Sequence, residues 1–176
     1  MIPGWFIAYL TFPGVIIHEA AHLLFCKICR VPVLDVCFFR VGNPAGYVIH
    51  EEVKDFTSAF LIAVGPFLLN SLLCLVFCFP AFVPVRIFGQ TDLLSYFMLW
   101  LGVSIGMHAF PSTQDAHGLW IQARRAARSL NPLALVSFPL VIGIYIANVL
   151  SVVWFDYLYG VAIGLGLPEI LLRHVA

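Results

Sequence analysis

The sequence predicts an all-α polytopic membrane protein, a bundle of four to five transmembrane helices with a short β-hairpin after the first. Apolar residues make up 62% of its 176 residues and charged residues 10%. The mean hydropathy of +1.00 is far above that of soluble globular domains. At about 20 residues per span, this length holds one bundle and no separate soluble domain, so we expect a single domain over residues 1–176. The net charge of zero gives no indication of a nucleic-acid partner.

The first apolar segment, residues 3–29, is expected to be a retained membrane span. No positively charged region precedes it, as one would precede the apolar part of a cleaved signal peptide. Lys27 and Arg30 lie at its end, and cations beside a span mark the cytoplasmic side. We therefore expect this segment to run from outside to inside.

The same segment contains the motif His18-Glu19-x-x-His22. Residues four apart lie on one face of a helix, so both imidazoles can point at one metal ion. Imidazole suits Zn²⁺, and zinc with three protein ligands and one open position binds a water whose pKa is near 7. Glu19 is placed to act on that water as a general base. Two structural histidines beside a helix-face glutamate are the alternative, but ionisable groups at membrane depth are usually functional.

This motif in a first apolar segment resembles the active-site helix of the site-2 protease family of intramembrane zinc metalloproteases. The resemblance covers residues 10–118, which would form the catalytic core. Residues 132–172 would then add one or two spans. The resemblance implies one Zn²⁺ per chain, a lipid bilayer as the setting, and transmembrane or membrane-associated proteins as substrates.

Residues 33–49 are expected to form the β-hairpin. β-Branched and aromatic residues flank the turn Gly42-Asn-Pro-Ala-Gly46, and this composition is typical of two strands joined by a turn. The resemblance implies that the hairpin holds substrate in extended form by pairing with it along one edge. A hairpin that merely caps the bundle would have the same sequence pattern.

The second span is expected over residues 56–82, with its end set by two prolines. Gly65-Pro66 in its middle frees a backbone carbonyl, and Asn70 brings an amide to membrane depth. The resemblance implies that Asn70 binds the substrate backbone near the zinc. Asn70 follows Gly65 by five residues, where four is the commoner spacing in the family. A hydrogen bond between helices is the alternative role for this amide.

The third span, residues 93–110, contains Gly102-x-x-x-Gly106, and such small residues permit close helix packing. We expect this span to pack tightly against its neighbours.

A second group of potential ligands follows this span, namely His108, Asp115 and His117. The resemblance implies an aspartate as the third zinc ligand, in a short Asp-Gly-type motif. Asp115 is its counterpart here, although Ala116 replaces the usual glycine. The two histidines are competing candidates, and a cap of the following helix is the structural alternative for Asp115.

That following helix contains Arg124, Arg125 and Arg128. An arginine cluster directly after a span is a second marker of the cytoplasmic side. We therefore expect a multi-pass protein of a prokaryotic cell membrane, with both ligand groups toward the cytoplasm.

The last apolar stretch, residues 132–172, is too long for one span. Its length corresponds to a helix of about 60 Å, twice the thickness of the bilayer core. We expect a break, with a fourth span over residues 133–153 and then a shorter fifth span or an interfacial segment. Asp156 is expected at a helix end or at the membrane interface, although a role beside the site is the alternative.

Together these observations predict a membrane-embedded zinc metalloprotease, an intramembrane endopeptidase. Its site would comprise His18, His22 and Asp115 as metal ligands, Glu19 as the base that deprotonates the zinc-bound water, and Asn70 as a substrate-binding residue. One alternative is a membrane metal-binding or transport protein, but its polar groups would line a path across both leaflets. Another is an inactive protease-like adaptor, which the intact motif disfavours.

Overall fold

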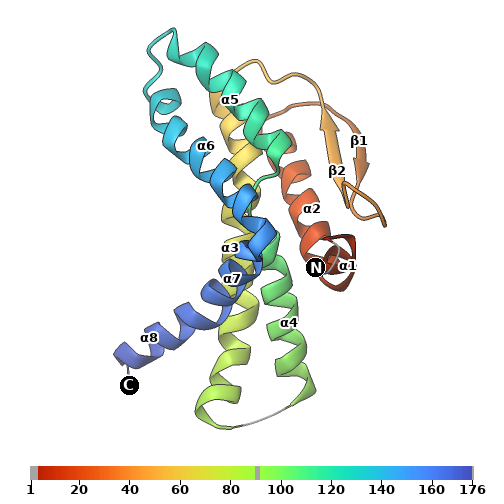
Figure 1. Ribbon diagram of the computed structural model, residues 1–176, viewed down its shortest axis with the longest axis vertical. Coiled ribbons are helices and arrows are strands. Elements are labelled where there is room, and N and C mark those ends of the chain that lie inside the picture. The colour runs from red at the N-terminus through yellow and green to blue at the C-terminus, as the bar shows by residue number, and fades with distance from the viewer. Residues whose placement is uncertain (1–3, 90–91, 176) are drawn as a thin grey trace.

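The structure is a computed structural model that describes residues 4–89 and 92–175, and it is mostly helical with one two-stranded sheet (Figure 1). The helices are α1 (Gly4–Leu10), α2 (Phe12–Ile28), α3 (Phe56–Ile87), α4 (Leu93–Met107), α5 (Thr113–Ala127), α6 (Pro132–Leu150), α7 (Phe155–Val161) and α8 (Leu167–Val175), and the strands are β1 (Val33–Cys37) and β2 (Tyr47–His50). A 3₁₀ turn (Ser151–Val153) follows α6, and a π-helical segment (Ala162–Gly166) joins α7 to α8.

Three helical segments of the described chain are long and apolar enough to cross a membrane. They are Phe56–Arg86, Pro132–Val153 and Phe155–Arg173, and α4 is a shorter apolar helix. This composition is compatible with a membrane protein, as the sequence predicts. How many of the helices cross the bilayer stays a prediction.

The first apolar segment is not one continuous helix, in contrast to the expectation for residues 3–29. It divides at Thr11 into α1 and α2. Pro13 lies at the start of α2, and a proline inside a helix clashes with the carbonyl four residues before it. The Thr11 hydroxyl donates to the Ile7 carbonyl at 2.7 Å, which satisfies that end of α1. As a result, α2 alone carries the His-Glu-x-x-His motif.

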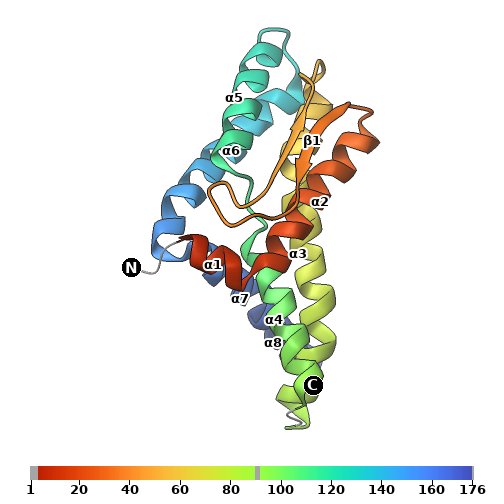
Figure 2. The same cartoon turned by 90° about the vertical axis from the view of Figure 1, so that its right-hand side faces the viewer.

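Helix α3 runs along most of the molecule in both views (Figures 1 and 2). Asp55 caps its start by accepting from the Ser58 backbone N–H at 2.9 Å, and hydrogen bonding from Ser58 holds the pKa of this carboxyl below its usual value. The expected end near residue 82 was wrong, because α3 continues through Pro80 and Pro84 to Ile87. In an apolar stretch the backbone polar groups find partners only within the helix. The helix therefore continues despite the loss of the hydrogen bonds that proline removes.

Close helix packing at glycine confirms the expectation for the third span. A Cβ atom built at Gly102 would lie 2.4 Å from the Cys78 sulfur, and one at Gly106 would lie 2.8 Å from the Cys74 sulfur. Both cysteines are on α3, so these glycines allow α4 to approach it. Gly14 has the same role between α2 and α4, because its Cβ would lie 2.0 Å from the Ser104 carbonyl oxygen.

The expected β-hairpin is confirmed. β1 and β2 pair antiparallel, with Asp35 opposite Ile49 and Cys37 opposite Tyr47, and a bulge interrupts the register between Val33 and Asp35. In Figure 1 the hairpin lies beside α2 on the side away from α6. Val33 and Val48 of the hairpin pack against a buried cluster that includes Cys26 of α2 and Ala59 and Ile62 of α3, so the sheet contacts both helices.

The expected break in the last apolar stretch is also confirmed. Trp154 adopts a left-handed conformation with φ 68°, and it separates α6 and its 3₁₀ turn from α7. Residues 132–172 therefore form two helical segments, each of which includes a candidate span. Asp156 lies in the first turn of α7, at a helix end as expected.

Candidate metal centre

Three residues that the sequence singles out as ligands lie together in the structure. One ligand atom from each of His18, His22 and Asp115 can be chosen such that all lie within 4.8 Å of one another. Helix α2 supplies the two histidines, and the first turn of α5 supplies the aspartate. The two histidines are 8% and 7% exposed, so the cluster is shielded from bulk solvent.

A backbone carbonyl fixes the proton on the His18 ring. The Nδ1 atom of His18 lies 2.6 Å from the carbonyl oxygen of His108. A carbonyl can only accept, so Nδ1 must carry the hydrogen and Nε2 presents a lone pair. Metal-binding histidines generally donate their second ring nitrogen in this way. The His18 ring is therefore oriented as a ligand through Nε2.

Two of the three distances between ligand atoms are close to those expected around a zinc ion. His18 Nε2 and His22 Nε2 are 3.1 Å apart, and His22 Nε2 is 3.5 Å from the Asp115 carboxylate oxygen Oδ2. Four atoms arranged tetrahedrally at 2.0–2.1 Å from zinc lie about 3.3–3.4 Å from one another. Two imidazoles and one carboxylate are also a donor set that zinc accepts with one position left open. The residues present fit this metal.

Asp115 is held by a capping box at the start of α5. Its carboxylate oxygen Oδ2 accepts from the Ser112 backbone N–H at 2.8 Å and from the Ser112 hydroxyl at 2.6 Å, while Ser112 Oγ accepts from the Asp115 N–H. Burial would raise the pKa of this carboxyl, but the His22 and Ser112 side chains outweigh that effect and lower the pKa. These contacts favour the ionised form of the Asp115 carboxyl. Ser112 is the N-cap of α5, and Asp115 is the third helical residue. Asp115 therefore takes part in capping the helix, as the structural alternative expects, but it is not itself the N-cap.

The connection between α4 and α5 is held from three helices. Asn70 on α3 donates from Nδ2 to the His108 carbonyl at 3.0 Å, the same carbonyl that His18 uses. Asn148 on α6 donates to the Pro111 carbonyl at 3.0 Å. The His108 ring contacts the Thr11 hydroxyl at 2.9 Å. These contacts determine where α5 begins and therefore where Asp115 lies.

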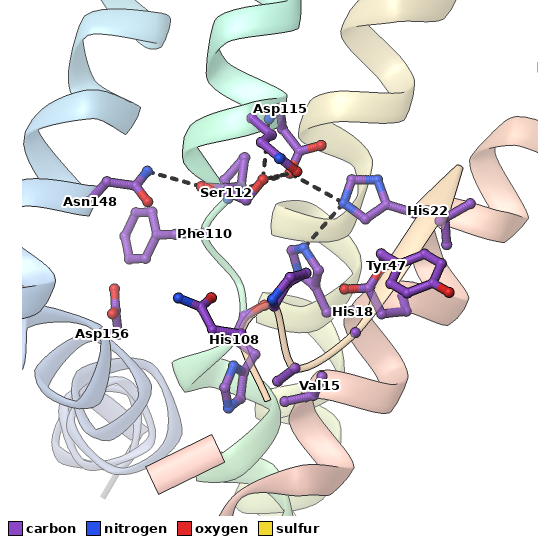
Figure 3. Close-up of a pocket in the computed structure, with 18 of the residues that line it drawn as sticks. Val15, His18, His22, Tyr47, His108, Phe110, Ser112, Asp115, Asn148 and Asp156 are labelled. Carbon is purple, nitrogen blue, oxygen red and sulfur yellow. Dashed lines mark hydrogen bonds and ion pairs between the residues drawn. The ribbon is translucent and has the colours of Figure 1, made fainter. Parts of the chain in front are cut away.

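A cavity of about 320 Å³ opens in front of the three ligands (Figure 3). Its wall combines α2, the hairpin loop with β2, the connection from α4 to α5, and polar residues of α6 and α7. The lining side chains with the most direct bearing on chemistry are His18, Glu19, His22, His50, Asp115 and Asp156. The cavity gives the ligand cluster space for a second molecule.

Glu19 lies in this cavity beside the two histidines and is 9% exposed. The hairpin loop packs directly on it, because a Cβ atom at Gly46 would lie 2.7 Å from Glu19 Cγ. Only glycine leaves room for the glutamate side chain in this position. The loop therefore limits where the Glu19 carboxylate can move.

Not every candidate from the sequence lies at the cluster. His117 is exposed and lines a separate pocket beside Tyr145, so it lies outside the cluster that Asp115 joins. The His108 ring points to Thr11 instead of to the cluster. Asn70 is fully buried behind the cavity and also donates to the Ile105 carbonyl at 3.4 Å. This contact matches its alternative role between helices, and its substrate-binding role stays a prediction.

Sequence reasoning missed two supports of the site. The pattern Ser112-x-x-Asp115 is a capping-box signal, and it could have placed Asp115 in the first turn of a helix. Asn148 carried no such signal, because an asparagine in an apolar segment indicates only that it finds some partner. Comparison with protein families, with curated proteins and with solved structures finds no match to this chain.

Proposed function

We propose that this chain is a multi-pass, membrane-embedded zinc endopeptidase of the site-2 protease type, which hydrolyses peptide bonds of membrane-protein substrates. The observation that carries the proposal is the convergence of His18, His22 and Asp115 beside Glu19 in one cavity. Zinc in that position would supply a Lewis acid for the peptide carbonyl and would acidify water. The sequence resemblance to the protease family, which rests on the same residues, agrees with the proposal.

In this proposal Glu19 is the general base. Its side chain lines the cavity next to the two histidines, so it can take a proton from a water there and return it to the leaving amine. The Gly46 contact restricts the Glu19 side chain and keeps its carboxylate within the cavity. His18, His22 and Asp115 would hold the metal, and the Asp115 carboxylate would balance part of its charge.

Strand β2 is the proposed site for the substrate backbone. Tyr47, Val48 and His50 of this strand line the cavity, and β1 occupies only one of its two edges. An extended peptide that paired with the other edge would lie along the cavity wall. A peptide in a helix has its carbonyls in internal hydrogen bonds, so extension would expose the bond to be cleaved.

The site is proposed to face the cytoplasm. Arg125 of α5 forms an ion pair with Glu52 at 3.0 Å, just before α3 begins. The arginine cluster therefore lies at the same end of α3 as the ligands, and positive charge beside spans marks the cytoplasmic side.

The first test combines metal content with cleavage. We expect about one zinc per purified wild-type chain, with zinc lost in His18→Ala and Asp115→Ala and kept in His117→Ala. The variant Glu19→Gln should keep the zinc and lose cleavage by at least about 100-fold, the usual scale for a general base. A peptide digest of a membrane proteome in detergent micelles, with new termini identified by mass spectrometry, serves as the substrate.

Each alternative function gives a different result in this test. Zinc bound by wild type together with equal cleavage in wild type and Glu19→Gln would contradict the proposed mechanism. A well-folded wild type that binds no zinc would favour the inactive adaptor. Loss of zinc only in His117→Ala would show that His117, and not Asp115, is the third ligand.

A further inference from the structure

Asp156 lies in the cavity wall and has no partner among the residues that the structure describes. It belongs to the first turn of α7, outside the part of the chain that carries the family resemblance, and it lines the same cavity as the ligands. Among the described residues we find no hydrogen bond or ion pair to its carboxylate. In Figure 3 the carboxylate points from α7 toward Phe110 and Asn148, on the side of the view opposite His22.

The charged side chains in the described lining of the cavity are all carboxylates. Its described lining includes three carboxylates, those of Glu19, Asp115 and Asp156, and no lysine or arginine. Asp115 already contacts His22 and Ser112, and Glu19 stands beside the metal ligands. Asp156 is the carboxylate that the ligand cluster does not use. A partly buried carboxylate without a partner favours binding of a cation, because pairing recovers part of the solvation that burial removes.

The ring of Phe110 lies beside Asp156 in the cavity wall (Figure 3). The centroid of this ring is 5.5 Å from that of Phe155 and 4.8 Å from that of Tyr159. An aromatic face accommodates the methylene stem of lysine or arginine and attracts its charged head. The neighbouring amide of Asn148 is engaged with the Pro111 and Ile144 carbonyls, so it does not compete for the carboxylate.

We propose that Asp156 and Phe110 form a specificity subsite that binds a lysine or arginine side chain of the substrate near the bond to be cleaved. The inference rests on the proposed endopeptidase function and names its substrate class, extended segments that carry a basic residue. Asp156 binds the cationic head and Phe110 contacts the stem. The cation enters a cavity that provides no competing lysine or arginine from its described wall.

Binding of two matched peptides tests the subsite separately from catalysis. The peptides are fluorescent, apolar and identical except for a central arginine or norleucine. The protein is the full chain with Glu19→Gln, loaded with zinc in non-ionic detergent, and fluorescence anisotropy gives the affinity. We expect the arginine peptide to bind about tenfold tighter, as for a charge-assisted contact that is partly shielded from water.

Variants at one position identify the source of this preference. Asp156→Asn should make the two affinities equal, whereas Asp156→Glu should keep most of the preference. Glu51→Gln is the matched control, because it removes one negative charge from an exposed residue outside the cavity lining, and it should leave the preference unchanged. Equal binding of both peptides to the parent chain, or an undiminished preference in Asp156→Asn, would overturn the subsite.

Cleavage of the same peptides by the chain with Glu19 intact separates the two proposals. Preferential binding of the arginine peptide without cleavage of either peptide would support the cation subsite and contradict the endopeptidase function. Cleavage of both peptides at equal rates, with equal affinities, would leave the endopeptidase standing and overturn the subsite.

Discussion

Asp115 has two roles that depend on the same carboxylate. Oxygen Oδ2 caps the first turn of α5 through Ser112 and faces His22 at 3.5 Å. The two roles support each other, because the capping contacts hold the oxygen where the histidines converge. A residue next to a metal ligand that fixes its orientation contributes to metal affinity, although it does not contact the ion.

Replacing Ser112 should therefore weaken metal binding as well as the helix. We expect Ser112→Ala to lower the free energy of unfolding by about 1 kcal/mol, as for the loss of a helix cap. We also expect about a tenfold loss of zinc affinity, measured by competition with a chelator. The backbone N–H of Ser112 still donates to Asp115, so the site is weakened and not abolished.

Asn131→Ala is the control for this experiment. Asn131 caps α6 by accepting from the Leu133 and Ala134 N–H groups, and it lies outside the lining of the metal cavity. It should lower stability by a similar amount and leave zinc affinity unchanged. Equal zinc affinity in the Ser112→Ala chain and in wild type would show that the cap does not position the ligand.

At the level of single residues, the sequence predicted the ligand cluster more fully than the groups that hold it. The spacing of His18 and His22 follows from helix geometry, so their common direction could be derived. Asp115 was identified from the family resemblance, and the structure brings its carboxylate close to the two histidines. The contacts of His18 and Asn70 with the His108 carbonyl join distant parts of the chain, and no local pattern encodes such pairs.

The hairpin loop is the element that limits the Glu19 side chain. A Cβ atom added at Gly46 would lie 2.7 Å from Glu19 Cγ and 3.0 and 3.1 Å from the backbone oxygens of Phe38 and Cys37, so it has no free direction. We expect Gly46→Ala to displace Glu19 and to slow cleavage by about 100-fold, the scale of a misplaced catalytic group. Zinc content should stay at the wild-type level, because His18, His22 and Asp115 are untouched.

Gly42 in the same loop offers a matched control. A Cβ atom at Gly42 would meet nothing within 4 Å, so Gly42→Ala should cleave at close to the wild-type rate. The cleavage rates of both variants can be measured with the same peptide digest. Their zinc contents can be measured on the same purified proteins. Equal cleavage rates for Gly46→Ala and Gly42→Ala would show that the loop does not determine the position of Glu19.

The sequence located some element boundaries better than others. The break after residue 153 was predicted because an apolar helix of that length exceeds the bilayer, and Trp154 provides it. The division at Thr11 was missed because the apolar stretch continues across it without a change in composition. The prolines of α3 led to a predicted helix end that was too early. Local propensity treats proline as a helix end, whereas an apolar environment preserves the helix.

At the scale of the whole molecule, the charge pattern predicts an orientation. The C-terminal ends of α2 and α5 both lie toward the upper end of Figure 1, and the far end of α3 lies at the bottom. Helix α3, with 32 residues, is about 48 Å long. This length exceeds the bilayer core of about 30 Å, so the two ends of α3 can contact opposite aqueous phases.

Labelling of single cysteines tests this orientation. In a chain with Cys29→Ser and Cys37→Ser, we expect a membrane-impermeant maleimide to label Ser129→Cys from the cytoplasmic side and Phe88→Cys from the opposite side. Both positions are exposed in the structure. The remaining cysteines, Cys26, Cys74 and Cys78, are buried. The parent chain without either added cysteine should therefore stay unlabelled and gives the background signal. Labelling of both positions from one side would contradict the topology.

The carbonyl shared by His18 and Asn70 has a consequence for how the protein is made. Ninety residues separate His18 from His108, and Asp115 follows still later in the chain. A ribosome that has synthesised α2 has produced both histidines, but neither their orienting carbonyl nor the third ligand. The proposed metal centre therefore needs α3, α4 and the start of α5 before it is complete, and until then the growing chain holds only two of its three proposed ligands.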